Sequence, residues 1–159
     1  LINQTVHYVD LLQWIMGPVT EVSGQFGVFA HDIETEDLCQ AQLRFESGAL
    51  GSLLGTTTYS VNEYTQFEVH GDCGGASVVN HKISKWEVKK EFEDRDGIRD
   101  ASAFDFEYDG PKNVLEDVVL VLNDGKLPAC DGAAGRKSLE LVTAVYDSCR
   151  RNAEWVSLA

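Results

Sequence analysis

The sequence is poor in basic residues: 13 Lys and Arg stand against 26 Asp and Glu in 159 residues, which gives a formal net charge of −13. Such an excess of negative charge repels the phosphates of nucleic acids and of anionic lipids, so we expect neither as a partner. The sequence also lacks an apolar run long enough to cross a bilayer and a signal-peptide pattern. These absences predict a soluble domain with a cytoplasmic localisation.

Closely spaced cysteines are absent as well. The four cysteines, Cys39, Cys73, Cys130 and Cys149, are scattered and form no Cys-x-x-Cys pair. Metal sites and disulfide frameworks are both poorly supported by such spacing, so reduced thiols in a cytoplasmic protein are the default. We therefore predict no metal site.

A phosphate-binding loop is also missing. Glycines cluster only in Gly71-Asp72-Cys73-Gly74-Gly75, and this stretch joins one strand pattern to another, with no helix start after it. We interpret it as a turn. This chain by itself is therefore expected to bind no nicotinamide cofactor.

Residues 3–17 are predicted to form a helix. Asn3 is a candidate N-cap, and Gly17 followed by Pro18 is a strong stop signal. The apolar residues cover most of the circumference of this helix; they are Tyr8, Val9, Leu12, Ile15 and Met16. Because a helix of this kind is normally buried, its remaining polar groups are expected to face something specific.

The polar residues of this helix fall on one stripe. Asn3, His7, Asp10 and Trp14 recur at spacings of four, three and four residues, which places them on one face. They could be local structure, with His7 paired to Asp10, Asn3 capping and Trp14 packing. They could also form a site, because an imidazole has a pKa suited to proton transfer near neutral pH. The spacing alone supports both interpretations equally.

The rest of the chain consists of strands followed by helices. Strands are predicted over 19–30, 38–45, 49–59, 62–70, 76–80 and 83–89, helices over 111–123 and 133–151, and a last strand over 155–158. The acidic residues 91–110 are predicted to be irregular. This order predicts an α+β domain with an open, mainly antiparallel mixed sheet and helices on one face. Apolar residues occur in both phases of some strands, so a partner subunit is expected on the other face.

Four stretches of the chain carry a family resemblance. They are Asn3-Gln4-x-x-His7-Tyr8-x-Asp10-Leu11-Leu12 with Gly17-Pro18, Glu36-Asp37 before a strand ending Phe45-Glu46-Ser47-Gly48-Ala49-Leu50-Gly51, Val69-His70-Gly71-x-x-Gly74, and Asp131-Gly132-x-x-Gly135-Arg136-x-Ser138-Leu139 running on to Tyr146-Asp147-Ser148. In this order they resemble the C-terminal domain of the glucose–fructose oxidoreductase, inositol dehydrogenase and rhizopine-catabolism (Gfo/Idh/MocA) family. The first and last of these four stretches look most like those of the UDP-N-acetyl-hexosamine or hexosaminuronate 3-dehydrogenases of surface-polysaccharide synthesis.

The resemblance implies that residues 1–159 are the substrate-binding and oligomerisation domain of a longer oxidoreductase. Its own N-terminal Rossmann domain, absent from this chain, would bind NAD or NADP. The implied activity is oxidation of a secondary hydroxyl of a sugar or UDP-sugar. The implied assembly is a homodimer or homotetramer formed through the face of the sheet. The alternative is a non-catalytic sugar sensor or regulatory scaffold on the same fold.

Three residues are candidates for the site, the first two through the resemblance and Asp10 through its position one turn after His7. His7 matches the family histidine, a general acid–base or substrate ligand. Asn3 occupies the usual Asp position of an Asp-x-x-x-His motif and cannot ionise, so we expect it to orient a substrate hydroxyl. Asp10 is predicted to contact substrate or to fix the tautomer of His7, or instead to brace the helix. The other histidines, His31, His70 and His81, are expected to be non-catalytic.

Overall fold

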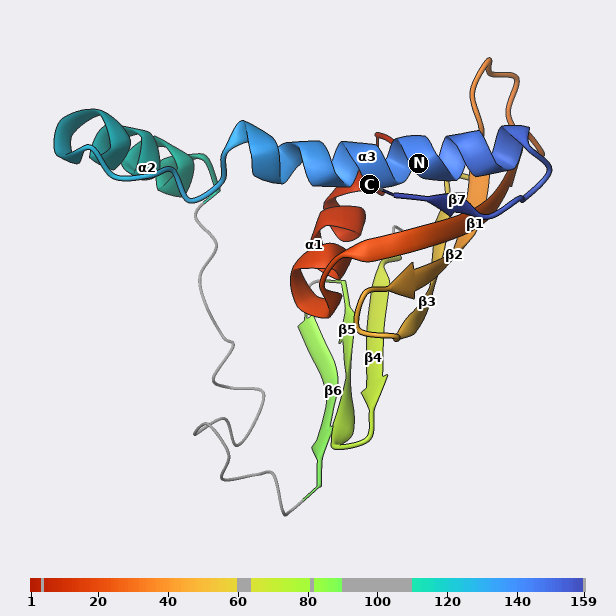
Figure 1. Ribbon diagram of the computed structural model, residues 1–159, viewed down its shortest axis with the longest axis horizontal. Helices are drawn as coiled ribbons and strands as arrows, with labels where there is room; N and C mark the ends of the chain where they lie inside the picture. The colour runs from red at the N-terminus through yellow and green to blue at the C-terminus, as the bar shows by residue number, and fades with distance from the viewer. Residues whose placement is uncertain (4, 60–63, 81, 90–109, 159) are drawn as a thin grey trace. The chain divides into compact units, whose positions relative to one another are not determined.

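The computed structural model describes residues 1–3, 5–59, 64–80, 82–89 and 110–158 (Figure 1). Two compact units are present: Leu1–Ser60 with Ala129–Ala159, and Val61–Pro128. The acidic segment 91–110, expected to be irregular, lies outside the described residues except for its last position. None of the described helices is long and apolar enough to span a membrane.

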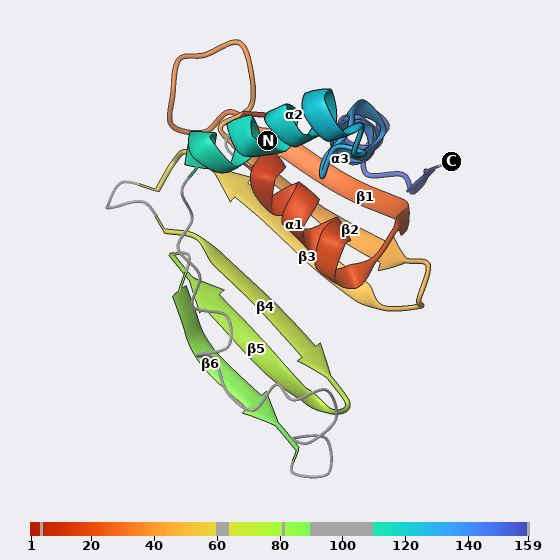
Figure 2. The same ribbon diagram turned by 90° about the vertical axis from the view of Figure 1, so that its left-hand side faces the viewer.

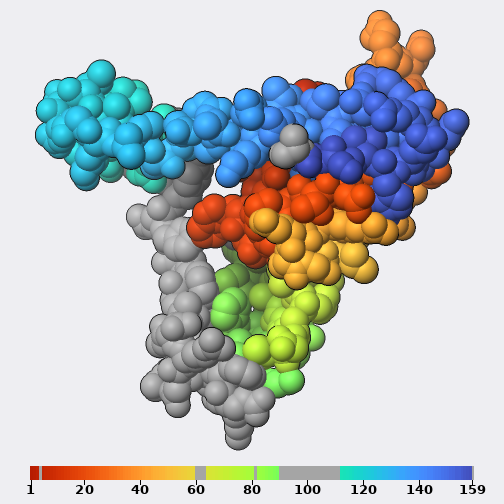
Figure 3. All heavy atoms as spheres, in the orientation of Figure 1, coloured from red at the N-terminus to blue at the C-terminus, as the bar shows by residue number. Residues whose placement is uncertain are grey.

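The first unit is built on an antiparallel sheet of four strands in the order β3-β2-β1-β7. The strands are β1 (Val19–Gly27), β2 (Leu38–Phe45), β3 (Leu50–Thr56) and β7 (Val156–Ser157). Helices α1 (Val6–Met16) and α3 (Gly132–Arg150) lie over one face of it (Figure 2). Helix α3 packs directly along β1, as the space-filling view shows (Figure 3). The predicted α+β class, with helices on one face, is confirmed.

Alternation along β2 explains which face the helices cover. Its odd-numbered side chains are buried: Cys39, Ala41, Leu43 and Phe45. Its even-numbered side chains are exposed: Gln40, Gln42 and Arg44. Because side chains of a strand alternate between faces, the apolar set points to the helices and the polar set points away from them. This is the pattern that the sequence predicts for residues 38–45.

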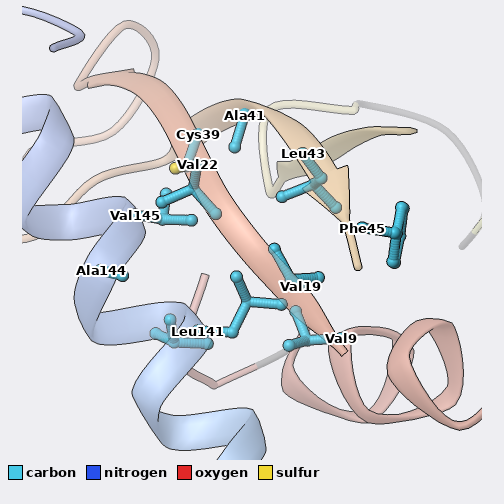
Figure 4. Packing of buried hydrophobic residues seen from close by; sticks show 11 residues of the cluster. Val9, Val19, Val22, Cys39, Ala41, Leu43, Phe45, Leu141, Ala144 and Val145 are labelled. Carbon is cyan, nitrogen blue, oxygen red and sulfur yellow. The ribbon is translucent and has the colours of Figure 1, made fainter. Parts of the chain in front are cut away.

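The core lies between that sheet face and the two helices. It joins Val9 of α1 and Leu141 and Val145 of α3 to the inner side chains of β1 and β2 (Figure 4). A β-carbon on Gly24 of β1 would lie 3.0 Å from Cγ1 of Val145 and 3.3 Å from Sγ of Cys149. The absence of a side chain at Gly24 therefore lets α3 approach the sheet closely at this point.

Helix α1 differs from its prediction at its start and in its burial. Its N-cap position is Thr5, without a side-chain capping bond, and Asn3 precedes the helix. The prediction of an Asn3 cap is therefore wrong, because Asn3 lies in a turn before the helix, where the backbone N–H of Thr5 donates to the carbonyl oxygen of Leu1 at 3.1 Å. Of this helix only Val9 is fully buried, and Trp14 is 83% exposed. The expected burial is also wrong for this chain, because α1 packs against its neighbours along one side.

The second unit contains a separate antiparallel sheet in the order β4-β5-β6. Its elements are β4 (Gln66–Gly71), β5 (Gly74–Val79), β6 (Lys82–Val88) and helix α2 (Gly110–Asp124). The seven described strands thus fall into two sheets, where the sequence predicts one, and every described pairing is antiparallel.

Candidate active site

His7 lies in the first turn of α1 and is exposed. Among the described residues, no hydrogen bond or ion pair engages its ring. The imidazole is therefore exposed and unpaired within the described part of the chain. An unpaired imidazole in such a position can accept or donate a proton near neutral pH.

Asp10, one turn further along α1, is hydrogen-bonded to helix α3 and not to His7. Its Oδ1 accepts a hydrogen bond from the Ser138 hydroxyl of α3 at 2.6 Å. Ser138 is 4% exposed, so the bond fastens α1 to the buried side of α3. No hydrogen bond or ion pair joins Asp10 to His7 in the described part of the chain. Of the roles predicted for Asp10, bracing the helix is the one that this bond matches.

Asn3 is exposed and lies in the turn before α1. Its predicted place on the helical stripe with His7 and Asp10 does not hold, because the helix begins at Val6. The turn itself is anchored: the backbone N–H of Ile2 donates to the hydroxyl of Tyr146 on α3 at 3.3 Å. Asn3 is thus kept next to the first turn of α1, with its amide directed to no partner among the described residues.

Near this turn lies a polar pair that the sequence does not reveal. The Tyr146 hydroxyl donates to Oε1 of Glu36 at 2.7 Å, and the Thr35 hydroxyl donates to Oε2 of the same carboxylate at 2.6 Å. Burial and the hydrogen bond to Glu36 raise the pKa of Tyr146 to about 12, so the phenol stays a donor. Glu36 and Tyr146 belong to two of the motif stretches, but nothing in their spacing indicates the contact.

Asp37 forms a second cluster that sequence patterns do not reveal. It is 2% exposed, and its carboxylate accepts from the backbone N–H groups of Phe29, Ala30 and His31 at 2.7–3.1 Å. Nδ1 of the His31 ring lies 3.2 Å from the same carboxylate. Burial raises the pKa of Asp37, but these donors outweigh it and lower the pKa to about 2. The cluster closes the connection between β1 and β2, which is a structural role for His31.

The stability supplied by Asp37 is expected to depend on pH. Its folded pKa of about 2 lies below the ordinary 3.8, so its contribution is complete above about pH 4 and is lost as the pH falls through 3.8 towards 2. Asp37→Asn is therefore expected to lower the urea midpoint at pH 7, with a difference from the parent that shrinks towards pH 2. Asp32→Asn, in the same connection, is the matched control. An equal deficit of Asp37→Asn at both pH values would contradict the assignment.

The described residues offer no metal site. No group of three or more His, Cys, Asp and Glu side chains among them is placed to hold an ion. The four cysteines are free thiols, and burial raises the pKa of Cys39 to about 12, which leaves that thiol unreactive.

The glycines of residues 71–75 do not fit a dinucleotide phosphate. They connect β4 to β5, and no helix begins there to offer its N-terminus to an anion. Gly74 has φ +153°, and a β-carbon there would collide with the carbonyl oxygen of Glu87. This glycine therefore serves the close packing of β5 on β6. The predicted interpretation as a turn agrees with this geometry.

Comparisons with known proteins agree with the fold. A family model described as the GFO/IDH/MocA C-terminal domain matches residues 1–77. No match is found among curated proteins. Among solved structures, the WlbA dehydrogenase from Chromobacterium violaceum in complex with NADH and UDP-GlcNAcA is 35% identical with a TM-score of 0.82, covering 99% of this chain and 45% of that one.

Two further solved structures are similar. The WlbA dehydrogenase from Bordetella pertussis in complex with NADH and UDP-GlcNAcA is 34% identical with a TM-score of 0.82, covering 99% of this chain and 47% of that one. A levoglucosan dehydrogenase in complex with NADH and L-sorbose shares the fold, with a TM-score of 0.71 at 15% identity over 99% of this chain and 49% of that one. The chain thus spans about half the length of these structures. Residues 1–77 therefore match the GFO/IDH/MocA C-terminal domain, and the chain is similar to the two WlbA dehydrogenase structures over 99% of its length.

Proposed function

We propose that this chain is the substrate-binding part of an NAD(P)-dependent dehydrogenase that oxidises a secondary hydroxyl of a sugar or nucleotide-sugar, with His7 as the general acid–base. The unpaired, exposed imidazole on α1 carries this proposal. A non-catalytic sugar sensor needs no proton acceptor at this position. Similarity to two dehydrogenases at 35% and 34% identity adds support.

The chemistry assigned to this chain is proton transfer and substrate orientation. Oxidising a secondary alcohol to a ketone removes the hydroxyl proton as well as a hydride. His7 accepts that proton, because a base with a pKa near the operating pH does so most efficiently. Asn3 offers one donor group and one acceptor to a neighbouring hydroxyl. Asp10 keeps Oδ2 as an acceptor for substrate while Oδ1 is bound to Ser138.

The cofactor is assigned to the part of the protein outside this chain. The two WlbA structures contain NADH, and the glycines of residues 71–75 do not fit a dinucleotide. We therefore propose NAD or NADP bound by an N-terminal Rossmann domain of the intact protein. The proton transfer proposed for His7 requires no contact between the cofactor and the described residues.

We also propose self-association through the outer face of the first unit's sheet. Leu50 and Leu54 of β3 are 77% and 63% exposed there. On the same face, the Arg44 guanidinium lies 4.2 Å from the ring centroid of Trp155. A face that combines exposed leucines with an arginine and a tryptophan supports a homodimer or homotetramer in the intact protein.

The substrate class follows from the UDP-GlcNAcA named in the two WlbA structures. The intact protein is expected to form NADH or NADPH with a UDP-linked N-acetyl-hexosaminuronate, and much less with the matching free sugar. A panel of UDP-sugars and free sugars, each with NAD and with NADP, tests this directly. The 159-residue chain alone is the control and is expected to form neither NADH nor NADPH. Absence of product with every sugar, from intact protein shown to bind the cofactor, would contradict the proposed function.

A further inference from the structure

The bond between Asp10 and Ser138 has the geometry of a strong interaction. Its O–O distance of 2.6 Å is that of a hydroxyl donating to an ionised carboxylate. The two residues are 128 positions apart, and Ser138 is buried on α3. The bond therefore fixes the direction of the Asp10 side chain as well as the contact of α1 with α3.

Without this bond, Asp10 has a second partner within reach. His7 precedes it by three residues, and side chains at that spacing are neighbours on a helix surface. A carboxylate next to an imidazole favours the protonated ring, which is the form that cannot accept a proton. His7 and Asp10 are also the only ionisable groups on α1 apart from Tyr8.

Among the described residues, the charged groups on the elements packed around α1 are exposed or already paired. On α3, the charged residues flanking Ser138 are Arg136, Lys137 and Glu140, which are all exposed. Arg136 is paired with Glu140 at 2.9 Å. In the connection between β1 and β2, Glu36 is bonded to Tyr146. The direction of the Asp10 side chain is thus what distinguishes a paired His7 from an unpaired one.

We propose that Ser138 is a positioning residue: it holds the Asp10 carboxylate against α3, so that the His7 imidazole stays unpaired and ready to accept a proton. The consequence for catalysis rests on the role of His7 proposed above. The placement of Asp10 can be tested without any turnover.

The test is a titration of the His7 ring by NMR in the intact protein with ¹³C-labelled histidine, the resonance being assigned with His7→Gln. Ser138→Ala is expected to raise the pKa of His7 by about 0.3, the size typical of an exposed pair one turn apart. The acid limb of the pH profile of kcat/KM is expected to move by the same amount. Ser138→Ala/Asp10→Asn is expected to abolish the rise, and Ser138→Thr, which keeps the hydroxyl, to titrate like the parent.

Ser148→Ala is the matched control. Ser148 lies on the same helix, is also buried, and accepts from the backbone N–H of Gly24 at 2.9 Å, with no bond to α1. It is expected to leave the titration of His7 unchanged. Ser138→Cys keeps the number of side-chain atoms, with a somewhat larger sulfur, but weakens the donor. It gives a second measurement should the alanine variant not fold, and a smaller rise in the pKa of His7 is expected.

An unchanged pKa of His7 in both Ser138→Ala and Ser138→Cys would overturn the proposal. So would a rise that persists in the double variant or that Ser148→Ala reproduces. A protein that shows the expected rise but oxidises no sugar would support the placement of Asp10 and overturn the dehydrogenase function instead.

Discussion

His7→Ala in the intact protein is expected to lower the turnover number for sugar oxidation by about 100-fold or more, the scale on which loss of a positioned acid–base group acts. The ring is exposed and has no partner among the described residues, so its removal costs the fold little. The loss is therefore expected in kcat, while the thermal midpoint stays near that of the parent. Steady-state kinetics with the UDP-sugar identified by the panel measure the effect.

His70→Ala controls for the loss of an imidazole as such. His70 lies on β4, and its side chain is 79% exposed, so this variant is expected to turn over like the parent. Unchanged turnover in His7→Ala would remove His7 from the mechanism. A pH profile of the parent without an ionisation near neutral pH would weaken its role in the same way.

Leu141→Ala is expected to lower the free energy of unfolding by about 2–5 kcal/mol, the range for deleting a fully buried leucine side chain. Leu141 is 0% exposed and belongs to the core formed by α1, α3 and the sheet (Figure 4). Its truncation leaves a cavity at the point where α1 and α3 share buried side chains. Urea denaturation followed by circular dichroism measures the change.

Leu139→Ala is the matched control on the same helix. Leu139 is 49% exposed, so the same chemical change is expected to cost less than about 0.5 kcal/mol. Equal losses in the two variants would mean that α3 does not bury the face described above.

Local patterns predict the parts of this fold that depend on neighbours in sequence. The alternation of residues 38–45 predicts β2 and its buried face, because a strand's side chains have a period of two. Asp131 caps α3 three residues before its bonding partner, with its carboxylate accepting from the backbone N–H of Ala134 at 2.8 Å. Each of these features is decided within a few residues of the chain.

The features that the sequence does not predict depend on distant partners. The start of α1 is set by a turn that Tyr146 anchors, and the direction of Asp10 is set by Ser138. The division of the strands into two sheets likewise depends on which strands pair. For the candidate site, the imidazole of His7 is visible in the sequence, but the exposed, unpaired state of its ring is a property of the fold.

The first unit takes its strands β1–β3 from residues before 60 and its helix α3 from residues after 129. During synthesis, the inner side chains of these strands leave the ribosome long before Leu141 and Val145 exist to cover them. Completion of the core must therefore wait for α3, and a nascent chain that stalls before it exposes the part of the apolar sheet face that α1 does not cover to the cell's chaperones.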